Sequence, residues 1–75
     1  MAGVLVGGMT PEEVEVWIGR IKEFAEKGDD EMAHICEDDF RYAILLSVSL
    51  GKGNALALAK AGLDTSKIKF CRYYA

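Results

Sequence analysis

One uninterrupted segment in the middle of the chain constrains the fold most. Residues 31–50 contain neither glycine nor proline and read EMAHICEDDFRYAILLSVSL. At 100° per residue, one face of this segment is apolar and consists of Met32, Cys36, Phe40, Ala43 and Leu50. The opposite face is polar and consists of His34, Glu37, Asp38 and Arg41. The pattern predicts a central helix, against which the rest of the chain packs.

The second half of this helix carries more apolar side chains than one face can hold. From residue 42 to residue 50 they surround the helix almost completely, so we expect this half to be covered on several sides, by the rest of the chain or by a second copy. A chain of 75 residues forms one small domain, whose core leaves a margin of only about 3–5 kcal/mol. A homo-oligomer is therefore one expectation.

The segment before the central helix carries a complete helix-start signal. Residues 1–9 are rich in glycine and predict a flexible lead-in. Thr10 suits the N-cap, Pro11 the first helical position, and Glu13 completes a capping box with Thr10. Apolar residues then recur at three- and four-residue spacing, which predicts a helix over residues 10–28. We expect Trp17, on this apolar stripe, to lie in the core or an interface.

The remaining elements follow from capping residues and glycines. Asp29 or Asp30 can cap the central helix over residues 30–50, which predicts an antiparallel hairpin with the first helix. Asn54 can cap a shorter third helix over residues 54–62 that ends at Gly62, in which Leu56, Leu63 and several alanines allow close packing on the other two. Residues 64–75 alternate in character and predict an extended tail laid over the helices. The predicted fold is a single all-α domain over residues 1–75.

Charge is segregated along the chain, although the formal net charge is only −3. Residues 1–40 carry eleven acidic and three basic residues, a net charge of −8, and residues 41–75 carry six basic residues and one acidic residue, a net charge of +5. Two interpretations stay open. The basic tail folds back on the acidic helices of its own chain, or one half binds an oppositely charged partner.

Several classes of protein are disfavoured by what the sequence lacks. The apolar patch at residues 4–6 follows no basic residue, and no apolar run approaches the roughly 18 residues of a membrane span, so we expect a cytoplasmic protein with no membrane contact. Cys36 and Cys71 are expected to be reduced thiols. The GKGN segment at residues 51–54 is too short for a phosphate-binding loop and lacks its Lys-Ser/Thr ending.

The best candidates for a site are His34, Glu37 and Asp38, whose spacing places an imidazole and two carboxylates on one helical turn. A metal could use such a trio, and so could general acid–base catalysis. Further ligands and a nucleophile are missing, so we expect no catalytic residues, no metal and no cofactor; an acidic, solvated face explains the same residues.

The tail interleaves cations with aromatic side chains, namely Lys67, Lys69, Phe70, Arg72, Tyr73 and Tyr74. Such a pattern suits single-stranded nucleic acid, but the acidic first half opposes that interpretation. Docking of the tail on Glu37, Asp38 or Asp39 is the favoured alternative, with Arg72 as a two-pronged partner for a carboxylate.

Two motifs resemble a group of short bacteriophage-encoded proteins. The first is A-H-x-x-E-D-x-F, here residues 33–40, and the second is L-x-T-x-x-I-x-F-x-R-Y-Y-A, here residues 63–75, with Tyr73 where the group usually has tryptophan. The resemblance covers somewhat over half of the chain and implies a viral origin, with residence in the host cytoplasm, but no activity. It implies that His34, Glu37, Asp38, Phe70, Arg72 and Tyr73 form one binding or packing cluster.

These observations predict a non-enzymatic phage accessory protein that binds a host or phage protein, as in host modulation or counter-defence. One alternative is a small-molecule or metal-binding module around His34, Glu37 and Asp38, with Arg72. The other is a self-assembling structural component, which the apolar excess between residues 42 and 50 favours.

Overall fold

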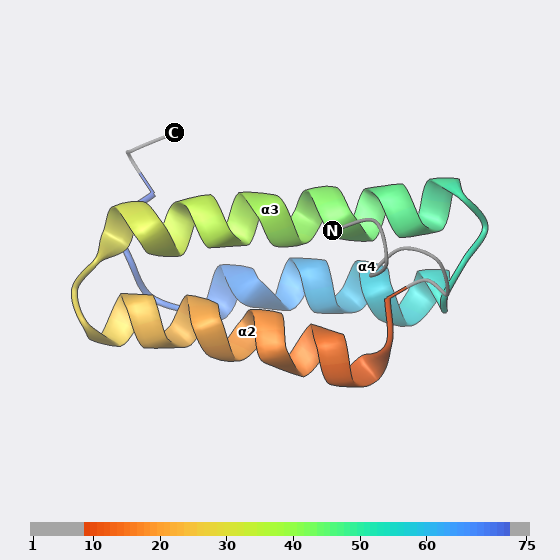
Figure 1. Ribbon diagram of the computed structural model, residues 1–75. Coiled ribbons are helices and arrows are strands. Elements are labelled where there is room, and N and C mark those ends of the chain that lie inside the picture. The colour runs from red at the N-terminus through yellow and green to blue at the C-terminus, as the bar shows by residue number, and fades with distance from the viewer. Residues whose placement is uncertain (1–8, 73–75) are drawn as a thin grey trace.

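The computed structural model describes residues 9–72, which form three α-helices and one short 3₁₀ turn (Figure 1). The elements are α2 (Pro11–Glu26), α3 (Asp30–Ser49), α4 (Ala55–Asp64) and η1 (Thr65–Lys67). No strand occurs between residues 9 and 72. The all-α prediction is therefore confirmed, whereas residues 1–8 of the predicted lead-in and residues 73–75 of the tail lie outside the described residues.

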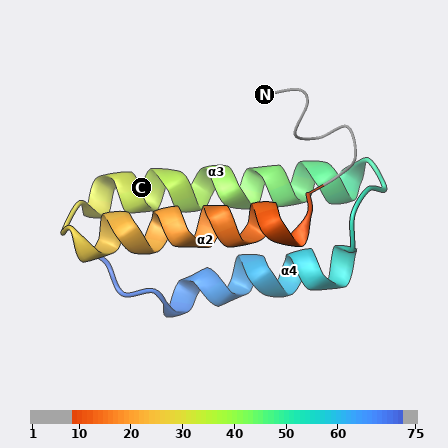
Figure 2. The ribbon, with the colours of Figure 1, turned by 60° about the horizontal axis from the view of Figure 1, so that its bottom comes forward.

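The three helices lie side by side with nearly parallel axes (Figures 1 and 2). Helices α2 and α3 form the predicted antiparallel hairpin, and α4 returns along α3 in the opposite direction. Because α3 packs against both other helices, it is the central element that its sequence predicted. Within residues 9–72, no helix is both long enough and apolar enough to cross a membrane.

Each helix begins at the capping residue that the sequence predicted. The Thr10 N–H donates to Glu13 Oε1 at 2.8 Å, and the Glu13 N–H donates to Thr10 Oγ1 at 3.2 Å, which completes the capping box. Asp29 accepts from the N–H of Met32 at 3.2 Å, and Asn54 accepts from the N–H of Ala57 at 3.0 Å. Local side-chain chemistry therefore fixes all three starts.

The first two helices end in left-handed glycines. Gly28 and Gly51 have φ angles of 79° and 71°, which side chains with a Cβ atom rarely adopt. After α2, the Gly28 N–H donates to the carbonyl of Ala25 and the Asp29 N–H to that of Phe24. This pair of bonds is a Schellman motif.

The predicted end of the third helix was wrong. Helix α4 does not stop at Gly62 but runs to Asp64, and η1 extends it, so the tail begins at Ile68 and not at residue 64. Gly62 is buried, and a Cβ atom there would meet Cδ1 of Ile44 at 3.2 Å. This glycine serves close helix packing rather than a helix end.

The core lies where α2, α3 and α4 meet and is small. Its buried apolar side chains are those of Met9, Ile21, Cys36, Phe40, Ile44 and Leu58. The Trp17 ring stacks on Phe40 at a centroid distance of 5.8 Å, which confirms the predicted packing role of Trp17. Met9, assigned to the flexible lead-in, is instead buried, and its N–H donates to Oγ of Ser47.

For several side chains, the predicted burial was wrong. Glu37, placed on the solvated face, is only 1% exposed, whereas Met32 and Leu50, placed on the packed face, are 39% and 53% exposed. In α4, the packing leucine is Leu58; Leu56 and Leu63 are exposed. The periodicity identified the helices and the packed stripe of α2, and it placed Cys36, Phe40 and Ala43 of α3 correctly. The exceptions arise because burial also depends on where the neighbouring elements pack.

Candidate functional site

The first candidate is the junction where the tail meets α3. Arg72 Nε donates to Glu37 Oε1 at 3.0 Å, and Arg72 Nη2 donates to Glu37 Oε2 at 3.1 Å. This bidentate pair joins residues 35 positions apart and buries the carboxylate. The predicted two-pronged docking of Arg72 on an acidic residue of the central helix is therefore confirmed, with Glu37 as the acceptor.

The tail folds back over the guanidinium of Arg72 and supplies its other partners. Nη2 also approaches the carbonyl oxygens of Thr65 and Ile68, at 3.0 Å each, and Nη1 donates to the carbonyl of Phe70 at 3.4 Å. The guanidinium carbon lies 3.9 Å from the centroid of the Phe70 ring, within range of a cation–π contact. Arg72 is thus fully engaged in holding the tail in place.

A second arginine extends the junction to α4. Arg41 lies one turn after Glu37 on α3, with Nη2 3.5 Å from Glu37 Oε2. Its Nε donates to the carbonyl of Gly62 and its Nη2 to Oγ1 of Thr65, both at 3.2 Å. Two guanidinium groups therefore share one buried carboxylate and connect α3, α4 and the tail.

The ionisation of Glu37 follows from these contacts. Burial is the largest single influence and by itself raises the pKa of this carboxyl group, but hydrogen bonding by Arg72 and Thr65 and the charges of Arg41 and Arg72 together outweigh it. The net result is a pKa below the ordinary glutamate value. The hydrogen bonds with Glu37 raise the pKa of Arg72, so the pair stays ionised.

His34 and Asp38 do not join Glu37 in a site. Nε2 of His34 lies 3.5 Å from Oδ2 of Asp38, whose side chain is 65% exposed. Both ring nitrogens of His34 are buried and have no hydrogen-bond partner in the part of the chain that the structure describes. Glu37 instead faces the tail, so the predicted trio does not converge on one point.

The junction has little capacity for chemistry. Between residues 9 and 72, no three His, Cys, Asp or Glu side chains are grouped so that they could hold a metal ion. The lone pairs of Glu37 are occupied by guanidinium groups, so this carboxylate is not available to a substrate or an ion. Of the predicted site residues, the structure brings Glu37, Phe70 and Arg72 together, leaves His34 and Asp38 beside them as a separate pair, and does not describe Tyr73.

The second candidate is an apolar surface on the outside of α3 and α4. It consists of Tyr42 and Leu45, each 68% exposed, Val48 at 37%, and Leu56 and Leu63, each 73% exposed. We call these five residues the α3–α4 apolar surface. The sequence had indicated that the second half of α3 would be covered, and within residues 9–72 the chain leaves Tyr42 and Leu45 uncovered.

A contact of Arg41 shows which flank of α3 borders α4. Arg41 reaches the carbonyl of Gly62 and therefore lies on the flank of α3 that borders α4. Leu45 and Val48 follow it by four and seven residues and share that flank. In α4, Leu56 and Leu63 are seven residues apart, so they share one face of the helix, and both are exposed.

Further large exposed apolar residues of α3 lie outside this surface. They are Met32, Ile35 and Leu50, whereas α2 contributes a single such residue, Val16. The sequence signal for the surface was present in the apolar excess after Tyr42. The contribution of α4 was missed because Leu56 and Leu63 were assigned to internal packing.

Comparison with known proteins adds no relationship to this geometry, because no protein-family model, curated protein or solved structure matches the chain.

Proposed function

We propose that this chain is a non-enzymatic protein that acts by binding another protein through the α3–α4 apolar surface. The observation that carries the proposal is the exposure of Leu45, Leu56 and Leu63, each at least 68%, on two adjacent helices. Scattered exposed apolar residues are normal, but a contiguous group on one side marks an interaction surface. Tyr42, which is also 68% exposed, belongs to a residue type enriched among the energetically dominant interface residues.

The junction of Glu37 and Arg72 supports this role indirectly. It ties the tail to α3 and, through Arg41, fixes α4 beside α3, so the two halves of the surface keep one relative position. A rigid apolar surface binds with less loss of conformational entropy than one that must first be ordered. In this proposal the tail residues hold the binding surface in shape and do not contact the partner.

The resemblance to short bacteriophage proteins supplies the setting that we propose. The partner would be a host or phage protein, met in the host cytoplasm. It would present apolar side chains at the centre of its own contact surface, since the α3–α4 apolar surface offers few charges to pair.

The experiment compares one double aspartate variant with one control variant. We would recover the partner from host lysate by photo-crosslinking from position 56, purify it, and measure its Kd by calorimetry. Leu45→Asp with Leu63→Asp should weaken binding at least tenfold, because both carboxylates would be buried in an apolar interface. Val16→Asp alters an exposed apolar residue on α2 and should leave Kd unchanged. Equal binding by both variants would contradict the proposal, as would recovery of no partner together with unchanged host growth on expression.

Self-assembly is the second candidate, favoured by the same exposed residues of α3. Sedimentation across a range of concentration separates the two functions. A dimer that Leu45→Asp converts to a monomer, and that Val16→Asp does not, would assign the surface to a second copy. A monomer at all concentrations would exclude a self-assembling component.

A small-molecule or metal-binding module around His34, Glu37 and Asp38 has less support, because Glu37 is already paired with Arg72. A melting-temperature screen against divalent metals and nucleotides tests it. A ligand at a hundred times its Kd would stabilise the fold by about 2.7 kcal/mol.

A further inference from the structure

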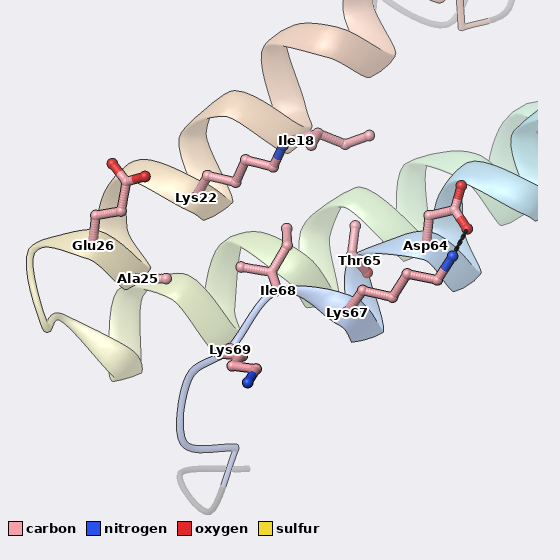
Figure 3. A pocket seen from close by; sticks show the side chains of 9 residues that line it. All are labelled: Ile18, Lys22, Ala25, Glu26, Asp64, Thr65, Lys67, Ile68 and Lys69. Atoms are coloured by element: carbon pink, nitrogen blue, oxygen red, sulfur yellow. Dashed lines mark ion pairs between the residues drawn. The ribbon is translucent and has the colours of Figure 1, made fainter.

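A groove with basic and apolar residues lies on a different side of the molecule, between α2 and the chain around η1 (Figure 3). It has a volume of about 790 Å³. Its apolar residues are Ile18, Ala25 and Ile68, all of them half-buried. Its basic residues are Lys22, Lys67 and Lys69. The groove shares no lining residue with the α3–α4 apolar surface.

The charge of the groove is more positive than its composition suggests. Nζ of Lys67 lies 3.6 Å from Oδ1 of Asp64, so these two charges offset each other. The carboxylate of Glu26 points away from the other residues of the groove (Figure 3). Lys22 and Lys69 have no ion-pair partner within residues 9–72. The groove therefore has two lysines without an ion pair, Lys22 and Lys69, beside an apolar floor, in a chain whose net charge is −3.

We propose that this groove binds an acidic segment of a partner protein, with an apolar side chain on the floor and carboxylates beside Lys22 and Lys69. The apolar floor of the groove favours a ligand that has an apolar side chain. A free phosphate or another small inorganic anion has none. Among residues 9–72, no aromatic side chain lines the groove, so this part of the chain offers nucleic-acid bases nothing to stack on there. An acidic peptide segment satisfies both the floor and the lysines.

The site explains part of the charge segregation in the sequence. Among the described cations of the tail, Arg72 docks on α3 through Glu37, and Lys69 has no ion-pair partner within residues 9–72. Folding of the chain on itself thus accounts for only one of the tail's positive charges. The positive charge of Lys69 lies at the groove, where the carboxylates of a partner can reach it.

The test is a titration of the ¹⁵N-labelled full chain with a synthetic peptide of alternating glutamate and leucine, followed by NMR. The control peptide has glutamine in place of every glutamate. We expect chemical-shift changes at the amides of Ile18, Lys22, Ile68 and Lys69 with the glutamate peptide. The glutamine peptide should bind more weakly, and added salt should reduce binding of the glutamate peptide.

Matched double variants decide whether the groove is responsible. Lys22→Gln with Lys69→Gln should weaken binding about five- to tenfold, since each exposed charge pair contributes modestly. Lys27→Gln with Lys52→Gln removes the same charge from exposed positions outside the groove and should change Kd less than about twofold. Circular dichroism of both variants checks that the helices are retained. The proposal is overturned if the two peptides bind equally, if the shifts lie on the α3–α4 apolar surface, or if both double variants lose the same affinity.

Discussion

The guanidinium of Arg72 and the carboxylate of Glu37 form a bidentate pair across 35 positions of sequence, at 3.0 and 3.1 Å. Glu37 is buried, and Arg72 is about one-third exposed. A buried charge is tolerated only while it is paired, so removal of one partner costs far more than removal of both. This asymmetry makes the pair the most informative target for mutation.

Arg72→Met should destabilise the protein by about 3 kcal/mol, because the Glu37 carboxylate would remain buried without its main partner. The double variant Glu37→Leu with Arg72→Met should recover most of that loss. Urea denaturation at neutral pH measures both. Lys67→Met breaks the exposed pair with Asp64 and serves as the control, with an expected loss under about 1 kcal/mol. If Arg72→Met matched this control, the junction would have no role in stability.

Stability should fall in acid through Glu37. Its pKa in the folded state is below the ordinary value, so the unfolded chain takes up this proton at a higher pH than the folded chain. The stabilisation is complete above the unfolded pKa, about 4.3, and is lost as the pH falls through the lower folded pKa. Urea midpoints measured from pH 7 to pH 3 should decline less steeply in Glu37→Leu with Arg72→Met than in the wild type. Parallel curves would show that other carboxylates account for the acid sensitivity.

Two glycines should respond to alanine in opposite directions. Gly19 is exposed within α2, and a methyl group added there would have no neighbour within 4 Å, so Gly19→Ala should stabilise the protein by about 0.8–1 kcal/mol. Gly28 has a φ angle of 79°, so Gly28→Ala should destabilise it by about 1–2 kcal/mol. Thermal unfolding followed by circular dichroism checks both. A loss of stability in Gly19→Ala would mean that this face of α2 is covered.

The two thiols should react at different rates. Burial raises the pKa of Cys36, and its side chain is only slightly accessible, whereas Cys71 is half-exposed; both are free. Iodoacetamide at neutral pH should therefore alkylate Cys71 first, as seen by mass spectrometry of proteolytic fragments. In urea the two rates should converge. Equal rates in the native protein would show that the core opens at Cys36 faster than alkylation.

Local chemistry made the helix starts predictable. Thr10, Asp29 and Asn54 each cap through an atom within three residues, so a short window of sequence contains all the information. The docking of Arg72 was also foreseen, because an arginine in a tail and a carboxylate on a helix have few better partners. Which of three neighbouring acidic residues would accept it was left open by the sequence.

The errors share one physical cause, which is that burial depends on distant segments. Glu37 has the spacing of a solvated residue and is buried only because the tail returns to it. Gly62 has a position typical of a helix end. It lies within α4 instead, where a Cβ atom would come close to the side chain of Ile44. Leu56 and Leu63 have the character of packing residues, but the buried direction of α4 is set by contacts at Leu58 and Gly62. Sequence periodicity carries no information about such distant contacts.

The position of Glu37 also has a consequence for the order of folding. Helices α2 and α3 contain the local signals to form a hairpin, yet in a hairpin without the tail the Glu37 carboxylate would lack its main partner. The intermediate of lowest free energy is one in which this part of α3 stays hydrated until Arg72 pairs with Glu37. Since the pair spans almost half of the sequence, formation of the core is linked to one of the last contacts to close. We therefore expect the hairpin and the tail to unfold together in one cooperative transition.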